Sequence, residues 1–146
     1  MDFGYIFTST EGRIPRSEWW AGLAVLVVIG VVLALLIAWV FGPTTFGLLL
    51  TLVLQIALIY PSYALSTKRF QDRDKPGVLA LIGIGLGLLQ TLARVVGLSN
   101  PVQPNAFDWI LGIALLIVGI WYLIELGILR GTVGENGYGP DPLAGR

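Results

Sequence analysis

The sequence contains no cysteine and no histidine. Without cysteine there is no disulfide and no thiol chemistry, and without both residues the usual protein ligands of zinc, haem iron and iron–sulfur clusters are missing. The lack of histidine also removes the commonest general base. We therefore predict no catalytic residues, no cofactor-binding residues and no metal site.

Charged residues are also scarce. They make up 12% of the 146 residues, whereas hydrophobic residues make up 55%. Soluble domains carry about 25% charged residues, so a water-soluble protein of this composition would lack the polar surface needed to cover its core. The composition predicts a chain that is solvated by lipid. Its formal net charge is zero, which gives no overall field to attract nucleic acid.

Four long apolar runs are present, and they cover residues 19–41, 46–65, 78–98 and 109–129. A helix rises about 1.5 Å per residue and the hydrocarbon core of a bilayer is about 30 Å thick, so about 20 residues cross it. We therefore predict an all-α membrane protein, a single membrane domain over residues 1–146 built as a four-transmembrane-helix bundle. Between the first two runs, Gly42-Pro43 should end one helix, and Thr44 or Thr45 should cap the next.

The lysines and arginines predict the orientation of the bundle. Eight of the nine lie before the first run, between the second and third, or after the fourth, and only Arg94 does not. Basic residues favour the cytoplasmic side of a membrane. We therefore expect both termini, the loop at 66–77 and the tail at 130–146 to be cytoplasmic. The tail is rich in glycine and proline and should be irregular.

Two glutamines lie inside the predicted spans at nearly equal depth. Gln55 is nine residues from the outer end of the second span, and Gln90 is eight residues from the outer end of the third. A hydrogen bond between them would hold the two helices together, and contact with a substrate is the alternative. The spans otherwise carry no continuous polar stripe.

Small residues recur at close helical spacing within three of the spans. The third span has Gly83 and Gly87 one turn apart, and the fourth has Gly112 and Gly119 two turns apart. Small residues let membrane helices approach closely. We expect this packing to lie within the chain's own bundle, and an interface of a homo-oligomer is the alternative.

The cytoplasmic segments carry charges of both signs, which favours a network of ion pairs over a polybasic lipid tether. Glu125 lies near the inner end of the fourth span, where a carboxylate must be paired, wetted or neutralised. We expect it to pair with Arg69 or Arg16, and Glu18 to pair with an arginine of the middle loop. The candidate network comprises Arg13, Arg16, Glu18, Arg69, Asp72, Lys75 and Glu125.

Three of these segments carry ordered motifs, which read G-R-x-x-R-x-E-[FYW]-W, R-x-x-D-x-x-[KR]-x-G and G-T-x-G-x-N-x-[YF]-G-P-D-P. The matching residues are Gly12, Arg13, Arg16, Glu18, Trp19 and Trp20; then Arg69, Asp72, Lys75 and Gly77; then Gly131, Thr132, Gly134, Asn136, Tyr138, Gly139, Pro140, Asp141 and Pro142. This pattern resembles the DUF805 family, small bacterial inner-membrane proteins of unknown function. The family often has His and Ser where Gln71 and Pro76 stand. The resemblance implies a multi-pass protein of a bacterial inner membrane, and it implies no reaction.

Three functions are compatible with these features. We predict a non-enzymatic module in the lipid bilayer whose cytoplasmic charged face binds an anionic lipid headgroup or a membrane protein partner, because guanidinium groups suit phosphate and carboxylate. A small transporter or channel subunit is the first alternative, with Gln55, Gln90 and Glu125 along its path in an oligomer. The second is a lipid-acting enzyme that uses a carboxylate such as Asp72 or Glu18 as its base.

Overall fold

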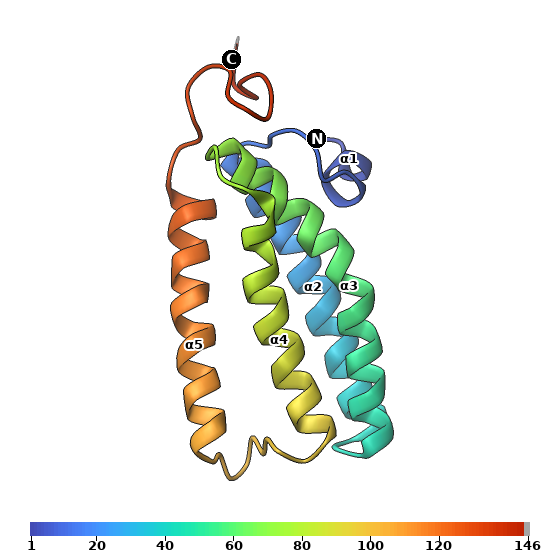
Figure 1. Cartoon of the computed structure of the whole chain (residues 1–146). Helices are drawn as coiled ribbons and strands as arrows, with labels where there is room; N and C mark the ends of the chain where they lie inside the picture. The colour runs from blue at the N-terminus through green and yellow to red at the C-terminus, as the bar shows by residue number, and fades with distance from the viewer. Residues whose placement is uncertain (145–146) are drawn as a thin grey trace.

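The computed structural model describes residues 1–144, which form a bundle of long helices with a short helix and an irregular tail at one end (Figure 1). The elements are α1 (Phe3–Thr8), α2 (Arg16–Phe41), α3 (Thr45–Asp72), the 3-10 helix η1 (Gly77–Leu79), α4 (Ala80–Val95), α5 (Ala106–Tyr122) and the π-helix η2 (Leu123–Ile128). Four helical segments within the described chain are long and apolar enough to cross a membrane: Arg16–Phe41, Thr45–Asp72, Gly77–Val95 and Ala106–Ile128. The predicted all-α membrane bundle of four spans is confirmed.

Local sequence signals account for where the helices begin. The side chain of Thr44 accepts a hydrogen bond from the backbone N–H of Gly47, so it caps α3 as predicted. Just before it, Gly42 adopts a φ of 60°, a left-handed value that favours glycine. At the start of α5, Asn105 and Asp108 form a reciprocal capping box. These caps place the turns between helices at one end of the bundle.

The second predicted span, 46–65, is shorter than the helix that contains it. Helix α3 continues without a break to Asp72, so the first part of the predicted loop at 66–77 is helical. Hydropathy marks the part of a helix that faces lipid, and this last part carries Lys68, Arg69 and Asp72, whose side chains are buried within the protein. The other helical segments begin and end within three residues of the predicted runs.

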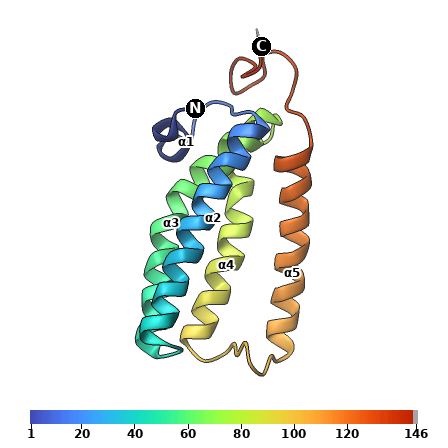
Figure 2. The same ribbon diagram turned by 180° about the vertical axis from the view of Figure 1, so that it is seen from behind.

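Helix α5 stands apart from α2 and α3 over most of its length (Figures 1 and 2). Along the span, α2 packs on α3, α3 on α4, and α4 on α5. Within residues 1–144, the fourth span meets α2 and α3 through η2 and through the last two residues of α5, Trp121 and Tyr122, whose rings pack on Phe70 of α3. The buried core lies at the same end of the bundle and comprises Ile6, Ile14, Trp19, Leu65, Phe70, Ala80 and Leu126. Tertiary packing is therefore concentrated where η2 meets its neighbours.

The small residues of α4 pack within the chain, as predicted, whereas those of α5 do not. A Cβ atom at Gly83 would lie 2.9 Å from an aromatic carbon of α5, and one at Gly87 would lie 3.0 Å from Nε2 of Gln55. At Gly112 and Gly119 an added Cβ would meet no atom within 4 Å. The reason is that α5 has α4 as its only helical neighbour along the span, so these two glycines face open space.

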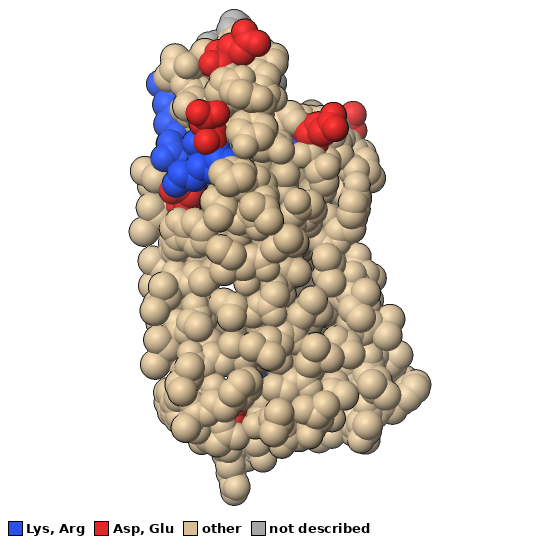
Figure 3. All heavy atoms as spheres, viewed as in Figure 1, with Lys and Arg blue, Asp and Glu red and all other residues tan. Residues whose placement is uncertain are grey.

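Acidic and basic side chains gather mainly at one end of the molecule on the face that Figure 3 shows. We call this the charged end, and it comprises residues 1–18, 66–77 and 123–144. The tail that belongs to it has no strand within the described residues beyond a single bridge between Asn136 and Gly139, in agreement with the predicted irregular structure. The predicted tail extends to Arg146, and its residues 145–146 lie outside the described chain.

Candidate functional site: a buried charge network at the charged end

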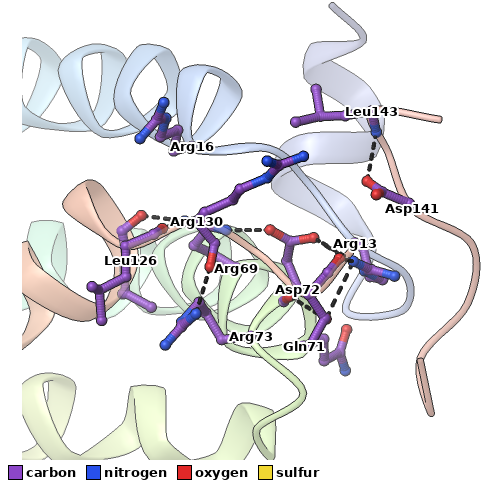
Figure 4. Close-up of polar contacts among 12 residues, drawn as sticks. Arg13, Arg16, Arg69, Gln71, Asp72, Arg73, Leu126, Arg130, Asp141 and Leu143 are labelled. Carbon is purple, nitrogen blue, oxygen red and sulfur yellow. Dashed lines mark hydrogen bonds and ion pairs between the residues drawn. The ribbon is translucent and has the colours of Figure 1, made fainter. Parts of the chain in front are cut away.

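Asp72, the last residue of α3, lies between two buried arginines (Figure 4). Its Oδ1 accepts a hydrogen bond from Nε of Arg13 at 3.1 Å, and its Oδ2 accepts one from Arg69. The three side chains are at most 4% exposed. One carboxylate therefore neutralises two guanidinium groups only in part, and other acceptors must bind their remaining donors because unpaired donors are costly in a buried site.

For Arg69, the remaining acceptors are backbone carbonyls at the end of the fourth span. Its Nε donates to the carbonyl of Leu126 at 2.6 Å, and a terminal nitrogen donates to the carbonyl of Leu129. Other side chains of α2 and the α3 end bind the neighbouring carbonyls: that of Gly127 accepts from Trp20, that of Ile128 from Arg16, and that of Arg130 from Arg73. The carbonyls of residues 126–130 all accept a side-chain hydrogen bond.

These carbonyls are available because they lie at a helix end. The last carbonyls of a helix have no partner within the helix, and together they form the negative end of the helix dipole, where cations are stabilising. The end of η2 therefore offers a row of acceptors to donors from the rest of the bundle. Side-chain hydrogen bonds to the backbone, together with the core packing at η2, attach the fourth span to α2 and α3.

Glu125 pairs with Arg73 and Lys75, so the prediction that it pairs with Arg69 or Arg16 is wrong. Its Oε1 accepts from Nε of Arg73 at 3.0 Å and from Nζ of Lys75 at 2.8 Å. The donors of Arg69 face the carboxylate of α3 and the carbonyls of η2. The partners of Glu125 instead come from the turn that follows α3, which the charge pattern alone did not distinguish from the end of the helix.

Arg13 fastens the tail to the network. Its terminal nitrogens donate to the carbonyls of Gly134 at 2.7 Å, Gly139 at 3.0 Å and Thr132 at 2.6 Å. Thr132 in turn binds the backbone carbonyl of Asp72 twice, through its N–H and through its hydroxyl, each at 2.8 Å. The tail is thereby bound through its backbone to the arginine and to the end of α3.

Lys68 stands next to Arg69 and binds the opposite side of the bundle. It is fully buried, and its Nζ donates to the carbonyls of Tyr5 and Ile6, each at 2.8 Å, and to that of Ser9. An ammonium group has three donors, and all three are used. Lys68 holds α1 against α3 in the same way that its neighbour holds the fourth span.

Two residues of the predicted network lie outside the ion pairs. The side chain of Arg16 is exposed and binds only a backbone carbonyl, and the side chain of Glu18 makes no hydrogen bond or ion pair within residues 1–144. The prediction that Glu18 pairs with an arginine of the middle segment is wrong. Arg69 donates to a carbonyl of the fourth span and Arg73 donates to Glu125, whereas Glu18 lies in the first turn of α2.

The two intramembrane glutamines do not hydrogen-bond to each other in this structure. Nε2 of Gln55 lies against Gly87, three residues before Gln90, and Oε1 of Gln55 is buried without a hydrogen-bond partner in the described chain. The expectation of a bond came from counting residues from the span ends. That count ignores the register between α3 and α4. The register places Gln55 opposite Gly87, and not opposite Gln90.

The sequence did not single out Lys68 as a site residue. Adjacent cations directly after an apolar span are usually an orientation signal, so their burial was not visible in the pattern. The tail did carry a signal, because Gly131 and Thr132 belong to the last motif. A Cβ at Gly131 would overlap the carboxylate of Asp72, so this position has no space for a side chain.

A pocket of about 180 Å³ opens beside the network, and Arg16, Arg69, Asp72, Arg130 and Asp141 contribute to its lining. Arg16 and Arg130 are both exposed, and the side chain of Arg130 makes no hydrogen bond within the described chain (Figure 4). The carboxylate of Asp141 accepts hydrogen bonds from backbone N–H groups of the tail, which hold its pKa below the usual range. The pocket therefore combines an ordered, ionised carboxylate with two accessible guanidinium groups.

Residues 7–140 match the family described as "Protein of unknown function (DUF805)". The chain belongs to this family. Among similar proteins, the "Uncharacterized protein YiiR" of Escherichia coli (strain K12) is 29% identical over 135 residues, which cover 91% of this chain and 85% of that protein. YiiR of Escherichia coli O157:H7 is similar to the same extent. No solved structure matches the chain.

The three family motifs meet at one carboxylate. Arg13 of the first motif and Arg69 of the second both bind Asp72, and Thr132 of the third binds the backbone of the same residue. Gln71, which stands where the family often has His, donates to the carbonyl of Thr10 at 3.1 Å. Segments far apart in this DUF805 chain are therefore brought together by side-chain donors and backbone acceptors.

We expect Asp72→Asn to destabilise the protein more than Glu125→Gln does. Neutralising Asp72 strands two arginines whose side chains are 1% and 0% exposed, and breaking a buried pair in this way costs about 3–5 kcal/mol. The cations beside Glu125 are 24% and 39% exposed, so water can solvate them once the carboxylate is neutral and the loss should be smaller. Thermal unfolding in detergent compares the two variants, and a larger loss for Glu125→Gln would contradict this assignment.

Proposed function

We propose that this DUF805 protein is a non-enzymatic multi-pass module of a bacterial inner membrane, and that its charged end faces the cytoplasm and binds the phosphate of an anionic lipid headgroup. The orientation is supported by the distribution of lysine and arginine, since seven of the nine belong to the segments of that end and Arg146 follows them in the sequence. The bacterial inner membrane is supported by the relatives from Escherichia coli.

The observation that carries the proposal is that some arginines of the charged end are buried and bound to the chain, whereas others are exposed. Arg13 and Arg69 are buried and bound to acceptors of the chain itself. Arg16 and Arg130 are exposed beside the 180 Å³ pocket. Guanidinium groups bind phosphate through paired, planar donors. Arg130 makes no side-chain hydrogen bond within the described chain, and Arg16 makes one, to the carbonyl of Ile128. The two exposed arginines therefore keep most of their donors for an anion.

The position of this pocket favours a headgroup over a soluble anion. Arg16 begins α2 and Arg130 follows η2, so both flank segments that are apolar enough to cross a membrane. Trp20, about one turn after Arg16, donates its indole N–H to the carbonyl of Gly127, three residues before Arg130, at 3.1 Å. Tryptophan prefers the interface between lipid and water, and arginine extends its head toward that level. A lipid phosphate occupies the same depth.

The chemistry of the carboxylates supports a binding role over an enzymatic one. Two carboxylates line the pocket. Both oxygens of Asp72 are bound by buried guanidinium groups, and each oxygen of Asp141 accepts a hydrogen bond from a backbone N–H of the tail. A general base must be free to take a proton from a substrate. Glu18, which is free of such partners in the described chain, does not line this pocket. The pocket thus supplies cationic donors, and every carboxylate oxygen that lines it already accepts a hydrogen bond.

To test the binding site, we would compare lipid retention by the double variant Arg16→Gln/Arg130→Gln with that of the wild type. Native mass spectrometry of the purified protein, titrated with phosphatidylglycerol or with phosphatidylcholine, gives the affinity for each. Losing two charge-assisted contacts should weaken phosphatidylglycerol binding about tenfold or more. Phosphatidylcholine binding should change less. The matched control is Arg94→Gln, which removes a cation outside the charged end.

Equal phosphatidylglycerol binding by the wild type and the double variant would contradict the proposal. If the wild type instead retains a protein partner without lipid, and the double variant loses that partner, the two arginines bind a protein.

The orientation has its own test. In a chain without native cysteine, Asn100→Cys and Asp74→Cys each introduce one exposed thiol at opposite ends of the bundle. A membrane-impermeant thiol reagent applied to intact cells should label Asn100→Cys alone, and both should be labelled after the cells are opened. Labelling of Asp74→Cys in intact cells would reverse the proposed topology.

A further inference from the structure

A second cavity lies within the membrane-spanning part of the bundle, away from the charged network. It has a volume of about 550 Å³, within the range of small-molecule sites. All four spans contribute to its lining, with Gly30 on α2, Gln55 on α3, Gly83 on α4 and Gly119 on α5. Because α5 does not pack against α2 or α3 along the span within the described chain, the cavity opens sideways toward lipid between α2 and α5.

One side of this cavity is a polar stripe along α3. Thr51, Gln55, Ser62 and Ser66 all line it, and their spacing places them on one helix face over about 22 Å at about 1.5 Å per residue. The stripe is not continuous, because Leu58 and Ile59 lie between Gln55 and Ser62 and also line the cavity. The stripe was hidden in the sequence because apolar residues separate its members, and only the helix period brings them together.

The polar groups of the cavity differ in whether they already have partners. The hydroxyl of Thr51 donates to the carbonyl of Gly47 in its own helix at 2.9 Å, and that of Tyr122 donates to the carbonyl of Leu79 at 2.6 Å. Oε1 of Gln55 is buried and accepts no hydrogen bond within residues 1–144. An acceptor left unpaired at this depth is costly. Because Gln55 lines the cavity, a rotation of its amide would present this unpaired acceptor to an incoming donor.

The lining also defines the charge of the occupant. No residue that lines the cavity is acidic or basic. A charged group would find no counter-ion there, and charges at membrane depth are costly. Apart from the stripe, the wall is mainly apolar, with residues such as Leu54, Leu58 and Leu115. An apolar chain with one uncharged donor matches this lining.

We propose that this cavity binds an uncharged, hydroxyl-bearing lipid, which enters between α2 and α5 and donates its hydroxyl to Oε1 of Gln55 while its chain packs on the apolar wall. The nearby serines of the stripe supply further polar contacts along the same face. This site is separate from the anion pocket of the charged end and involves none of its arginines.

The test uses hexadecanol as the probe and hexadecyl methyl ether as its matched analogue, which has the same chain and no donor. Native mass spectrometry of the protein in detergent gives the binding of each. The wild type should bind the alcohol about three- to tenfold more tightly than the ether, the effect of one net hydrogen bond. Gln55→Leu should abolish this preference. Gln90→Leu, a glutamine at similar depth that does not line the cavity, should retain it.

A second pair of variants tests the cavity itself. Gly119 lines it and an added Cβ would meet no atom within 4 Å, so Gly119→Leu should fill the space and reduce binding of both probes about tenfold without disrupting the fold. Gly112→Leu, on the same helix and equally free of contacts, lies outside the lining and should bind both probes normally. Thermal unfolding without probe checks that all variants are folded.

Three results would overturn the proposal. Equal binding of the alcohol and the ether by the wild type would show that the hydroxyl of the probe donates no hydrogen bond in the cavity. An equal loss of preference in Gln55→Leu and Gln90→Leu would remove the assignment to Gln55. Unchanged binding of both probes by folded Gly119→Leu would show that the probes do not bind in this cavity.

Discussion

The fourth span has α4 as its only helical neighbour until its last turns, where the guanidinium of Arg69 reaches its backbone. This one side chain joins the carboxylate of Asp72 to the carbonyls of Leu126 and Leu129. Arginine suits the task because its donors are fixed in a plane and it stays charged when buried. A helix end supplies unpaired carbonyls together with a negative dipole, so the contact satisfies the cation and the backbone at once.

The same principle recurs at the other buried cations. Lys68 binds the carbonyls around the end of α1, and Arg13 binds carbonyls of the tail. Each of the three cations binds the backbone of a different segment, namely the fourth span, α1 or the tail, and Asp72 binds two of the three. Most charged side chains of this end therefore bind other parts of the protein, and Arg16 and Arg130 are its exposed arginines within residues 1–144. Inside the membrane, the loose attachment of α5 leaves room for a cavity beside α3.

The number of spans and most helix ends followed from the sequence, because hydrophobic length and capping residues act locally. The end of α3 did not, since Lys68 and Arg69 interrupt the apolar run while the helix continues. The sequence placed Arg13, Arg69 and Asp72 in one network through their motifs, but it assigned Glu125 to the wrong arginine. Which of several nearby cations pairs with a carboxylate depends on side-chain direction and on competing backbone acceptors, and neither is encoded in charge order.

The attachment of the fourth span through Arg69 is most directly tested by a distance between spin labels on α2 and η2. Labels at the exposed positions Val28 and Ile128 should give one narrow distance distribution in the wild type. Arg69→Met should broaden it, because η2 loses its anchor, while a label pair at Val28 and Phe46 on α2 and α3 stays unchanged. A distribution as narrow in Arg69→Met as in the control Arg94→Met would contradict the account.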